Sequence, residues 1–263
     1  MTRELLSVII PVADGGEFLN QALSSVMAQN YQPLEVCIVD VGSFPASQSY
    51  GEHVQYLRCD PCWPAAARNR GLARAQGSLI AFLDADDLFA PGHLGRLSAM
   101  LAADATAGIA QGGMRNWRFS KDGGGAYCSP GYRFASLCSS VFRRSVFDQV
   151  GCLDESLRFG EDSDFFLRCW EQGIRKLKTE EVSLLYRRHG GNMTANKDLR
   201  GLGVVQVYKR RLDRIRRGRF DVNAVHQEAL REFLGEPALA YDDGGEQPVG
   251  AEVLDHLVCH QSR

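Results

Sequence analysis

The stretch LIAFLDADD at residues 79–87 decides the fold of this chain, because five apolar residues run directly into a group of three carboxylates. A continuous apolar run of this length is typical of a strand that is buried on both faces of a parallel sheet. Aspartate is disfavoured inside strands, so we expect this strand to end where the acids begin. The stretch therefore predicts an acidic cluster at the carboxyl end of a buried strand.

The acidic cluster of Asp84, Asp86 and Asp87 has two interpretations. Open α/β sheets bind their ligands at the carboxyl edge of the strands, and three neighbouring carboxylates repel one another unless a cation lies between them. We therefore expect a divalent-metal site that receives a phosphorylated ligand. The alternative is a polar turn in which Asp87 caps the next helix, although three acids exceed what a cap needs.

A regular alternation of strands and helices surrounds this stretch. Residues 7–12 and 34–39 have the composition of buried strands, and residues 17–29 between them place apolar side chains at helical spacing. A strand, helix, strand unit of this length should be right-handed and have parallel strands. Because the alternation continues to residue 186, we predict an α/β fold with a mostly parallel central sheet.

Other expected elements follow from the same patterns. We expect further strands at residues 54–57, 79–83, 108–111, 136–142 and 177–186, further helices at 65–75, 91–103, 143–150, 163–172 and 204–220, a loop at 122–125 and a short helix at 251–260. The character of the sequence changes beyond residue 199, where a basic helix precedes a tail rich in glycine and acids. This change predicts a catalytic domain at 1–198 and a C-terminal helical extension with a tail at 199–263.

Composition limits the classes of function. The chain has 263 residues, an apolar fraction of 44% and a net charge of −2. The chain is long and apolar enough to form a complete hydrophobic core, and its small net charge does not favour binding to nucleic acid. No apolar run reaches the roughly 20 residues needed to span a bilayer, and Pro11 interrupts the N-terminal apolar run, so we expect no signal peptide. Eight cysteines without such a signal favour reduced thiols and a cytoplasmic protein.

Five motifs are similar to those of the family 2 glycosyltransferases, and they occur in that family's order. They are SVIIPV at 7–12, EVCIVD at 35–40, AARNRG at 66–71, FLDADD at 82–87 and GEDSDFFLR at 160–168. The similarity covers roughly residues 5–195. It implies the Rossmann-like GT-A fold and an inverting transfer of a sugar from a nucleoside-diphosphate sugar, with a UDP-sugar as the expected donor, to a hydroxyl of a saccharide or lipid-linked acceptor.

The resemblance also implies roles for individual residues. Asp162 matches the general base, and Glu161 matches a residue that orients the acceptor or replaces that base. Asp86 and Asp87 match ligands of Mn²⁺ or Mg²⁺, with His189 as a third ligand. Positions that match the donor site are Pro11, Ala13, Asp40, Arg68, Asp84, Ala85 and Asp86.

General chemistry is consistent with these roles. A cation would neutralise charge that develops on a diphosphate leaving group, and adjacent carboxylates raise each other's pKa toward a value useful for a base. Other interpretations remain open for three of these features. Glu161 and Asp162 also suit the positive end of a helix dipole, His189 also suits an exposed basic loop, and Arg68 also suits a solvated helix face.

Two positions depart from the family pattern. Ala13 stands where the family commonly has an aromatic residue, and Val41 stands where it commonly has a second acid after Asp40. Loss of a stacking ring removes about 1–3 kcal/mol of base affinity by analogy with other nucleotide sites. A second hypothesis is therefore a catalytically impaired relative that binds a nucleotide-sugar or acts as a scaffolding subunit. A sugar nucleotidyltransferase fits poorly, because residues 14–17 are acidic instead of forming a basic glycine-rich loop.

The basic helix expected at 204–220 has two interpretations as well. Its cations form a solvated face on a helix packed against the catalytic domain, or they rest on an anionic membrane surface. The second interpretation predicts a peripheral protein at the inner face of the membrane.

Overall fold

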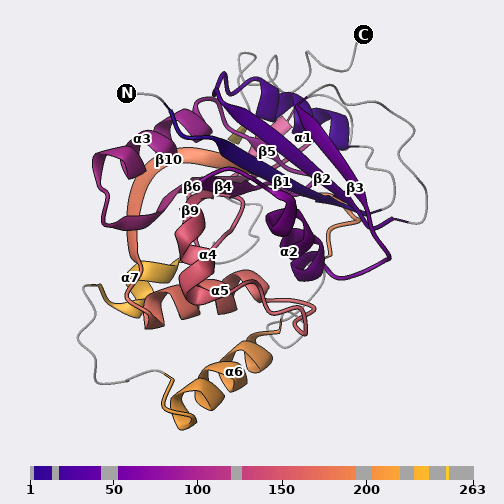
Figure 1. The fold of residues 1–263 in the computed structure, drawn as a ribbon. Helices are drawn as coiled ribbons and strands as arrows, with labels where there is room; N and C mark the ends of the chain where they lie inside the picture. The colour runs from indigo at the N-terminus through magenta and orange to yellow at the C-terminus, as the bar shows by residue number, and fades with distance from the viewer. Residues whose placement is uncertain are drawn as a thin grey trace.

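The computed structural model describes residues 3–13, 18–42, 53–119, 126–193, 203–219, 228–236 and 247–248. Within these ranges, ten strands form one curled, mixed sheet that has helices on both faces (Figure 1). The expected loop at 122–125 and the expected helix at 251–260 lie outside the described residues. In chain order the elements are β1 (Leu6–Val12), α1 (Leu19–Met27), β2 (Leu34–Asp40), β3 (Val54–Arg58), α2 (Pro64–Arg74), β4 (Leu79–Phe82), β5 (Leu88–Phe89), α3 (His93–Ala103), β6 (Ala107–Phe119), β7 (Ala126–Cys128), β8 (Arg133–Phe134), β9 (Ser140–Arg143), α4 (Arg144–Val150), α5 (Glu161–Glu171), β10 (Arg175–Arg187), α6 (Val204–Arg216), α7 (Leu230–Leu234), β11 (Gly235–Glu236) and β12 (Gln247–Pro248).

Four parallel strands form the core of the sheet in the order β4-β1-β2-β3. Ile9 of β1 lies opposite Cys37 of β2 on one side and Phe82 of β4 on the other, and these three side chains are at most 2% exposed. The predicted α/β fold with a mostly parallel core is therefore confirmed. Since the four strands run in one direction, their carboxyl ends share one edge of the sheet.

The other half of the sheet contains antiparallel strands. β9 lies between β4 and β6 and is antiparallel to both. β10 runs parallel to β6, with irregularities in register, and pairs antiparallel with the short strand β5, where Leu185 lies opposite Leu88. This pairing places the end of β10 beside the acids that follow β4.

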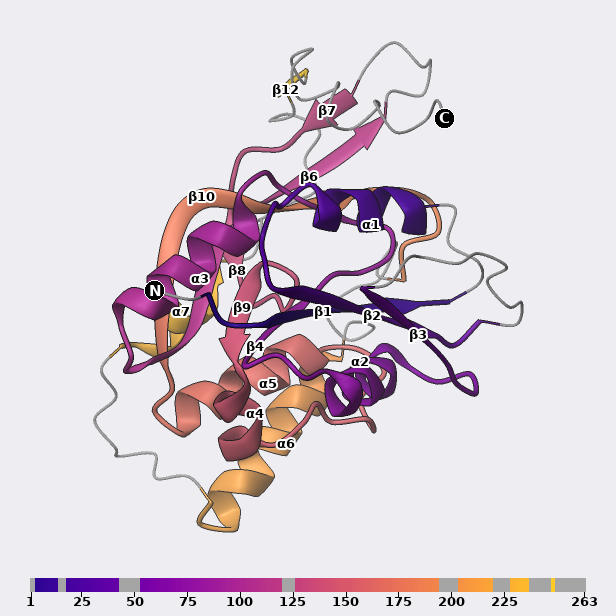
Figure 2. The same ribbon diagram turned by 45° about the horizontal axis from the view of Figure 1, so that its top comes forward.

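The helices divide between the two faces of the sheet. α1 and α3 cover one face, and α2, α4 and α5 cover the other (Figures 1 and 2). α2 packs closely on β1 because residue 71 is glycine: a Cβ atom there would lie 2.4 Å from Cγ2 of Ile9. This close contact fixes the helix that carries Arg68.

The C-terminal residues that the structure describes pack against the earlier part of the chain. α7 inserts Phe233, which is 2% exposed, into the main core, and β11 pairs with β8. α6 lies against α5 (Figure 2). The proposed division into 1–198 and 199–263 stays a prediction. No helix within the described ranges is both long enough and apolar enough to cross a membrane.

The cations of α6 do not all lie on a solvated face. Arg214 faces α5, where it lies 2.8 Å from a carboxylate oxygen of Asp164 and 2.6 Å from one of Glu171. Val205 and Tyr208 are 60% and 59% exposed. Val207, 6% exposed, packs with Leu157 and Leu167. The helix therefore docks through this apolar contact as well as through ion pairs, and it leaves Val205 and Tyr208 at the surface.

Candidate active site

Arg68 joins the two acidic motifs of the sequence. It lies on α2 with a side chain only 4% exposed, and its guanidinium places Nη2 2.5 Å from Oδ1 of Asp84 and Nη1 2.7 Å from Oε1 of Glu161. The carboxylate after β4 and the carboxylate at the start of α5, 77 positions apart in numbering, thus share one cation. A buried guanidinium with two carboxylate partners is a fixed part of the site.

The charge of Arg68 is stabilised by its surroundings. Burial disfavours the charged guanidinium, but Asp84, Asp162 and Glu161 outweigh this effect and raise the pKa of Arg68 well above its ordinary value. The guanidinium therefore supplies a permanent positive charge among these acids. Such a charge is suited to holding either carboxylates or phosphate oxygens.

Asp162 lies in the first turn of α5, next to Glu161. The turn before it contains Gly160 with φ of 80°, a left-handed conformation that favours glycine. Oδ2 of Asp162 accepts a hydrogen bond from the backbone N–H of Leu137 at 3.0 Å. Burial and, to a smaller extent, Glu161 raise the pKa of Asp162 to about 7 against the opposing effect of Arg68. A carboxylate with a pKa near neutrality suits a general base.

Asp86 and His189 form a second group of polar atoms at the same sheet edge. Nε2 of His189 lies 2.9 Å from Oδ2 of Asp86, and Nδ2 of Asn192 lies 3.3 Å from the same oxygen. The side chains of Asp86 and His189 are 32% and 28% exposed, so both reach solvent. Sequence analysis did not single out Asn192, which also accepts the backbone N–H of His189 and so fixes the turn that follows β10.

Asp87 lies differently from Asp84 and Asp86. Its side chain is 1% exposed and accepts a hydrogen bond from the backbone N–H of Arg187 at 2.8 Å. Burial, with contributions from Asp86 and Asp84, raises the pKa of Asp87 well above its ordinary value. Asp87 therefore links the acidic turn to β10, and Arg187 strengthens that link by donating to the carbonyl oxygen of Asp86 at 2.7 Å.

The described part of the chain contains no ready-made cluster of three or more His, Cys, Asp or Glu side chains for a metal ion. Asp86 and His189 nevertheless place an oxygen and a nitrogen 2.9 Å apart, and both reach solvent. Mn²⁺ and Mg²⁺ accept carboxylate and imidazole ligands, and Mg²⁺ commonly takes its remaining ligands from substrate phosphates and water. The residues fit a cation that binds together with a diphosphate.

Asp40 lies at the end of β2 and is 2% exposed. It accepts a hydrogen bond from the N–H of Gly42 at 2.8 Å and another from the hydroxyl of Tyr56, and Nη1 of Arg58 lies 3.8 Å away. Sequence analysis missed Tyr56 and Arg58, although the register of β2 with β3 places Arg58 directly opposite Asp40.

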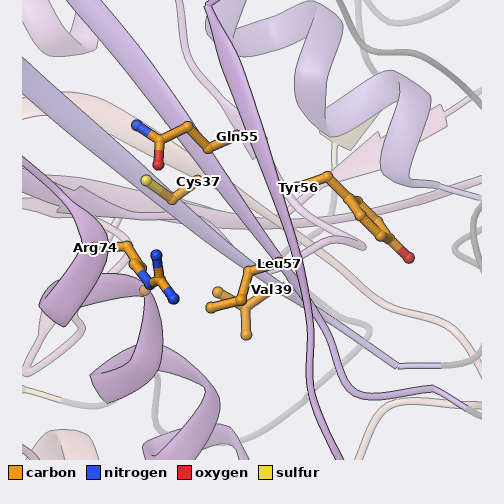
Figure 3. A pocket seen from close by; sticks show the side chains of 7 residues that line it. Cys37, Val39, Gln55, Tyr56, Leu57 and Arg74 are labelled. Carbon is orange, nitrogen blue, oxygen red and sulfur yellow. The ribbon is translucent and has the colours of Figure 1, made fainter.

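The remaining expected donor residues lie near the same edge. Pro11 is the last residue but one of β1, Ala13 follows that strand, and Ala85 lies between Asp84 and Asp86 and packs against the core. A separate cavity of about 70 Å³ lies between β2, β3 and α2, and Figure 3 shows its lining side chains together with Tyr56, which points away from the others. Its residues are Cys37, Val39, Gln55, Tyr56, Leu57, Gly71 and Arg74.

Solved structures with the same fold define the class of protein. The chain is similar to the mannosyltransferase PcManGT from Pyrobaculum calidifontis in complex with GDP-Man and Mn²⁺, with a TM-score of 0.62 and 18% identity over 81% of this chain and 65% of that one. It is also similar to residues 1–349 of S. aureus TarS in complex with UDP-GlcNAc, with a TM-score of 0.58 and 15% identity over 74% of this chain and 61% of that one. The fold is that of the GT-A glycosyltransferases.

The sequence profile of glycosyl transferase family 2 matches residues 7–151, and the chain belongs to this family of sugar-transferring enzymes. An uncharacterized glycosyltransferase of Nostoc sp. is 27% identical over 225 residues, which is 71% of this chain and 66% of the relative. One of Rickettsia prowazekii is 25% identical over 62% of this chain and 58% of its own length. The minor teichoic acid biosynthesis protein GgaA of Bacillus subtilis is 26% identical over 70% of this chain and 47% of its own. The chain thus spans about half to two thirds of the length of these relatives.

Proposed function

We propose that this protein is a metal-dependent, inverting glycosyltransferase that transfers a sugar from a nucleoside-diphosphate sugar to a hydroxyl of an acceptor. The observation that carries the proposal is the position of Arg68, which holds Asp84 and Glu161 on its two sides at 2.5 and 2.7 Å. This arrangement joins a donor side, after β4, to an acceptor side, at the start of α5. The complexes of its structural neighbours with nucleotide-sugars support the same class of donor.

The donor side would be formed by the ends of β1, β2 and β4. Asp84 and Asp86 would contact the ribose and diphosphate, Arg68 would stabilise negative charge there, and Pro11, Ala13 and Ala85 would line the site. Ala13 has no aromatic ring to stack on the base. Tyr56, whose hydroxyl donates a hydrogen bond to Asp40, would supply such a ring. We assign base recognition to Asp40 and Tyr56, with a UDP-sugar as the first donor to test.

Asp86 and His189 are the residues that would hold Mn²⁺ or Mg²⁺, and Asp87 would position the acidic turn against β10. A bound cation would neutralise negative charge on the diphosphate. Asn192 would keep His189 directed toward Asp86, because it contacts both residues. The bound Mn²⁺ of the mannosyltransferase neighbour supports a divalent cation in this role.

Asp162 would accept the proton of the attacking hydroxyl. The acceptor oxygen forms a bond to the anomeric carbon, the bond from that carbon to the diphosphate oxygen breaks, and its electron pair leaves with the nucleoside diphosphate. Attack from the face opposite the leaving group inverts the anomeric centre. Glu161, held by Arg68, would orient the acceptor beside Asp162.

A non-catalytic nucleotide-sugar-binding or scaffolding subunit is the second candidate function. The residues expected to bind the nucleotide base favour this candidate. Ala13 and Val41 replace the aromatic residue and the second acid that are common in the family, and the carboxylate of Asp40 already accepts hydrogen bonds from Gly42 and Tyr56. Turnover of a donor separates this candidate from the first.

A thermal-shift panel tests the proposed function. Nucleoside diphosphates and their sugars are compared with and without Mn²⁺, and ligand at 100 times its Kd should stabilise the native state by about 2.7 kcal/mol. We expect one base to give a midpoint shift that requires Mn²⁺. The absence of a shift for every nucleotide would contradict the proposal.

The acceptor would be a saccharide or a lipid-linked saccharide, and α6 offers a surface for an anionic membrane. Val204, Val205 and Tyr208 are 49%, 60% and 59% exposed, and Arg216 is 75% exposed on the same helix. Apolar and cationic side chains together suit the boundary of an anionic bilayer. Flotation with anionic vesicles should be lost in a Val205→Asp, Tyr208→Asp variant, and equal flotation of the two proteins would remove this surface from the account.

A further inference from the structure

Trp63 is an exposed aromatic residue at the edge of the sheet where the candidate site lies. It occupies the N-cap position of α2 and is 43% exposed, whereas Trp117 is fully buried and Trp170 is partly buried. The guanidinium of Arg158 lies over the indole, 4.2 Å from the ring centroid. The indole therefore offers apolar ring surface to solvent as well as to Arg158.

The position of the Trp63–Arg158 pair is set by the same two elements that carry the acids. Arg68 follows Trp63 by five residues on α2, which is about 7.5 Å along a helix axis. Arg158 precedes Glu161 by three residues in the connection to α5. The pair therefore lies five residues from Arg68 and three from Glu161 along the chain, at the start of the two elements that form the acceptor side of the proposed site.

Hydrogen bonds fix this connection against α2. Nδ2 of Asn69 donates to the carbonyl oxygen of Leu153 at 2.9 Å, and Oδ1 of Asn69 accepts the N–H of Leu153 at 3.0 Å. Asn69 also donates to Glu155 at 2.9 Å. Three bonds therefore hold the start of the connection on α2, and the contact of Arg158 with Trp63 joins the same two segments further along.

The guanidinium of Arg158 covers one face of the indole, and the part of the ring that stays exposed matches the chemistry of a sugar ring. The C–H face of a pyranose packs on an aromatic ring, and its hydroxyl groups accept hydrogen bonds from the five N–H groups of arginine. We propose that Trp63 and Arg158 form a subsite that binds a pyranose ring of the saccharide acceptor and delivers its hydroxyl toward Asp162. The assignment as acceptor rests on the proposed function, whereas the binding of a saccharide can be measured independently of it.

The alternative occupant of this ring would be the base of the donor, and the structure favours the acceptor. The partner of Trp63 belongs to the connection that leads into Glu161 and Asp162, and Trp63 begins α2, on the face of the sheet that also carries α5 (Figure 1). The donor base is already assigned to Asp40 and Tyr56, which bond to each other, and the ring of Tyr56 points away from the other side chains that line the cavity on the α2 side (Figure 3).

Tryptophan fluorescence tests the saccharide subsite directly. Methyl α- and β-glycosides of glucose, galactose, mannose and N-acetylglucosamine are titrated as probes into the full chain. We expect at least one probe to give a saturable change in emission, no saturable change in Trp63→Ala, and at least a tenfold higher Kd in Arg158→Ala. The matched control is Phe119→Ala, which removes another exposed aromatic side chain, 39% exposed, at the last residue of β6.

Further variants separate binding from folding. Trp63→Phe keeps an aromatic face, so the probe that binds best should still raise its melting midpoint, whereas Trp63→Ala should lose that shift. No saturable change with any probe, or a change that persists in Trp63→Ala, would overturn the proposal.

The donor panel distinguishes failure of the subsite from failure of the proposed function. Trp63→Ala should keep the nucleotide-sugar shift of the wild type, and loss of that shift would place Trp63 in the donor site and overturn the proposal. Saccharide binding that depends on Trp63 in a protein that binds no nucleotide-sugar would support the subsite and contradict the glycosyltransferase.

Discussion

Arg68 is the residue on which the electrostatics of the site depend. With a side chain 4% exposed, it compensates Asp84 and Glu161. Removing one partner of a buried ion pair leaves uncompensated charge, so we expect Arg68→Ala to lower the free energy of unfolding by about 3–5 kcal/mol. Urea denaturation measures the loss.

Arg70 is the matched control for this prediction. It lies on the same helix and donates to the carbonyl oxygen of Asp60 at 3.1 Å, without a carboxylate partner among the recorded contacts of the described residues. We expect Arg70→Ala to cost no more than about 1.5 kcal/mol, because its hydrogen bond to a carbonyl oxygen is exposed to water. Equal losses in the two variants would contradict the role given to Arg68.

Asp162 sets the pH dependence of the reaction. Its pKa is raised to about 7 by burial and by Glu161, and only the ionised carboxylate can accept a proton. kcat/KM should therefore rise with pH through about 7 and level off above it. Asp162→Asn should lower kcat by about 10²–10⁴-fold, the usual contribution of a general base.

The measurement for Asp162 is a pH–rate profile with the donor identified by the thermal-shift panel. Donor binding provides the control, because Asn at position 162 can still accept the N–H of Leu137, which lies 3.0 Å from the Asp162 carboxylate. A profile that falls as pH rises through 7, or wild-type turnover in Asp162→Asn, would show that another group accepts the proton.

At the scale of elements, the contact of α2 with β1 positions Arg68. A Cβ atom at Gly71 would lie 2.4 Å from Cγ2 of Ile9, whereas one at Gly95 of α3 would meet nothing within 4 Å. We expect Gly71→Ala to destabilise the protein by about 1–3 kcal/mol through overpacking. Gly95→Ala should stabilise it by about 0.5–1 kcal/mol, because alanine favours the helix.

Thermal and urea denaturation of both glycine variants check this prediction. Donor affinity should fall in Gly71→Ala, since α2 must shift to relieve the contact and Arg68 shifts with it. If Gly71→Ala folded as stably as Gly95→Ala, the close packing of α2 on β1 would not be what positions the site.

α6 provides a second comparison at this scale. Arg214 is 17% exposed and pairs with Asp164 and Glu171, which are 2% and 3% exposed. Arg216 is 75% exposed and lies 3.8 Å from Asp213. Arg214→Ala should cost about 1–3 kcal/mol, because Asp164 and Glu171 lose one buried partner but keep Arg168 at 2.8 Å and Arg211 at 3.6 Å. Arg216→Ala should cost under about 1 kcal/mol.

Chemical denaturation of these two variants also reports whether α6 belongs to the cooperative unit. A single transition at a lower midpoint in Arg214→Ala is the expected result. A wild-type midpoint would mean that the docking of α6 on α5 contributes nothing measurable to stability.

Local patterns in the sequence were sufficient for the elements that carry the site. β1, β2, β4, α2 and α5 were predicted because apolar runs and helical spacing are properties of short segments. Local patterns did not predict the hydrogen bonds between Asp40 and Tyr56 and between Asp87 and Arg187. These bonds depend on strand register and on the pairing of β10 with β5, which are long-range features. The ion pairs of Arg214 with Asp164 and Glu171 were also missed, because the cations of this helix were expected to form a solvated face or to meet a membrane.

The candidate site residues illustrate the same limit. Asp84 and Glu161 were predicted as part of one site by similarity to a family, but nothing in the local sequence indicated that Arg68 would bridge them. Asn192 gave no signal of its own, because its role depends on the turn after β10. The roles of these residues stay predictions until they are tested.

At the scale of the whole molecule, the fold concentrates residues that are distant in sequence at one sheet edge. The parallel core aligns the ends of β1, β2 and β4, and the antiparallel pairing of β10 with β5 brings His189 back to Asp86. α5 adds Asp162 from the α2 side. The account therefore predicts that donor-side and acceptor-side variants fail in different ways.

Release of nucleoside diphosphate from a donor panel tests this central claim most directly. It is measured with and without Mn²⁺ for the wild type, Asp86→Ala and Asp162→Asn. The account predicts Mn²⁺-dependent release by the wild type, weakened donor binding in Asp86→Ala, and normal donor binding with at least a hundredfold slower transfer to an acceptor in Asp162→Asn. Release that is unaffected by either substitution, or no release from any donor by the wild type, would contradict it.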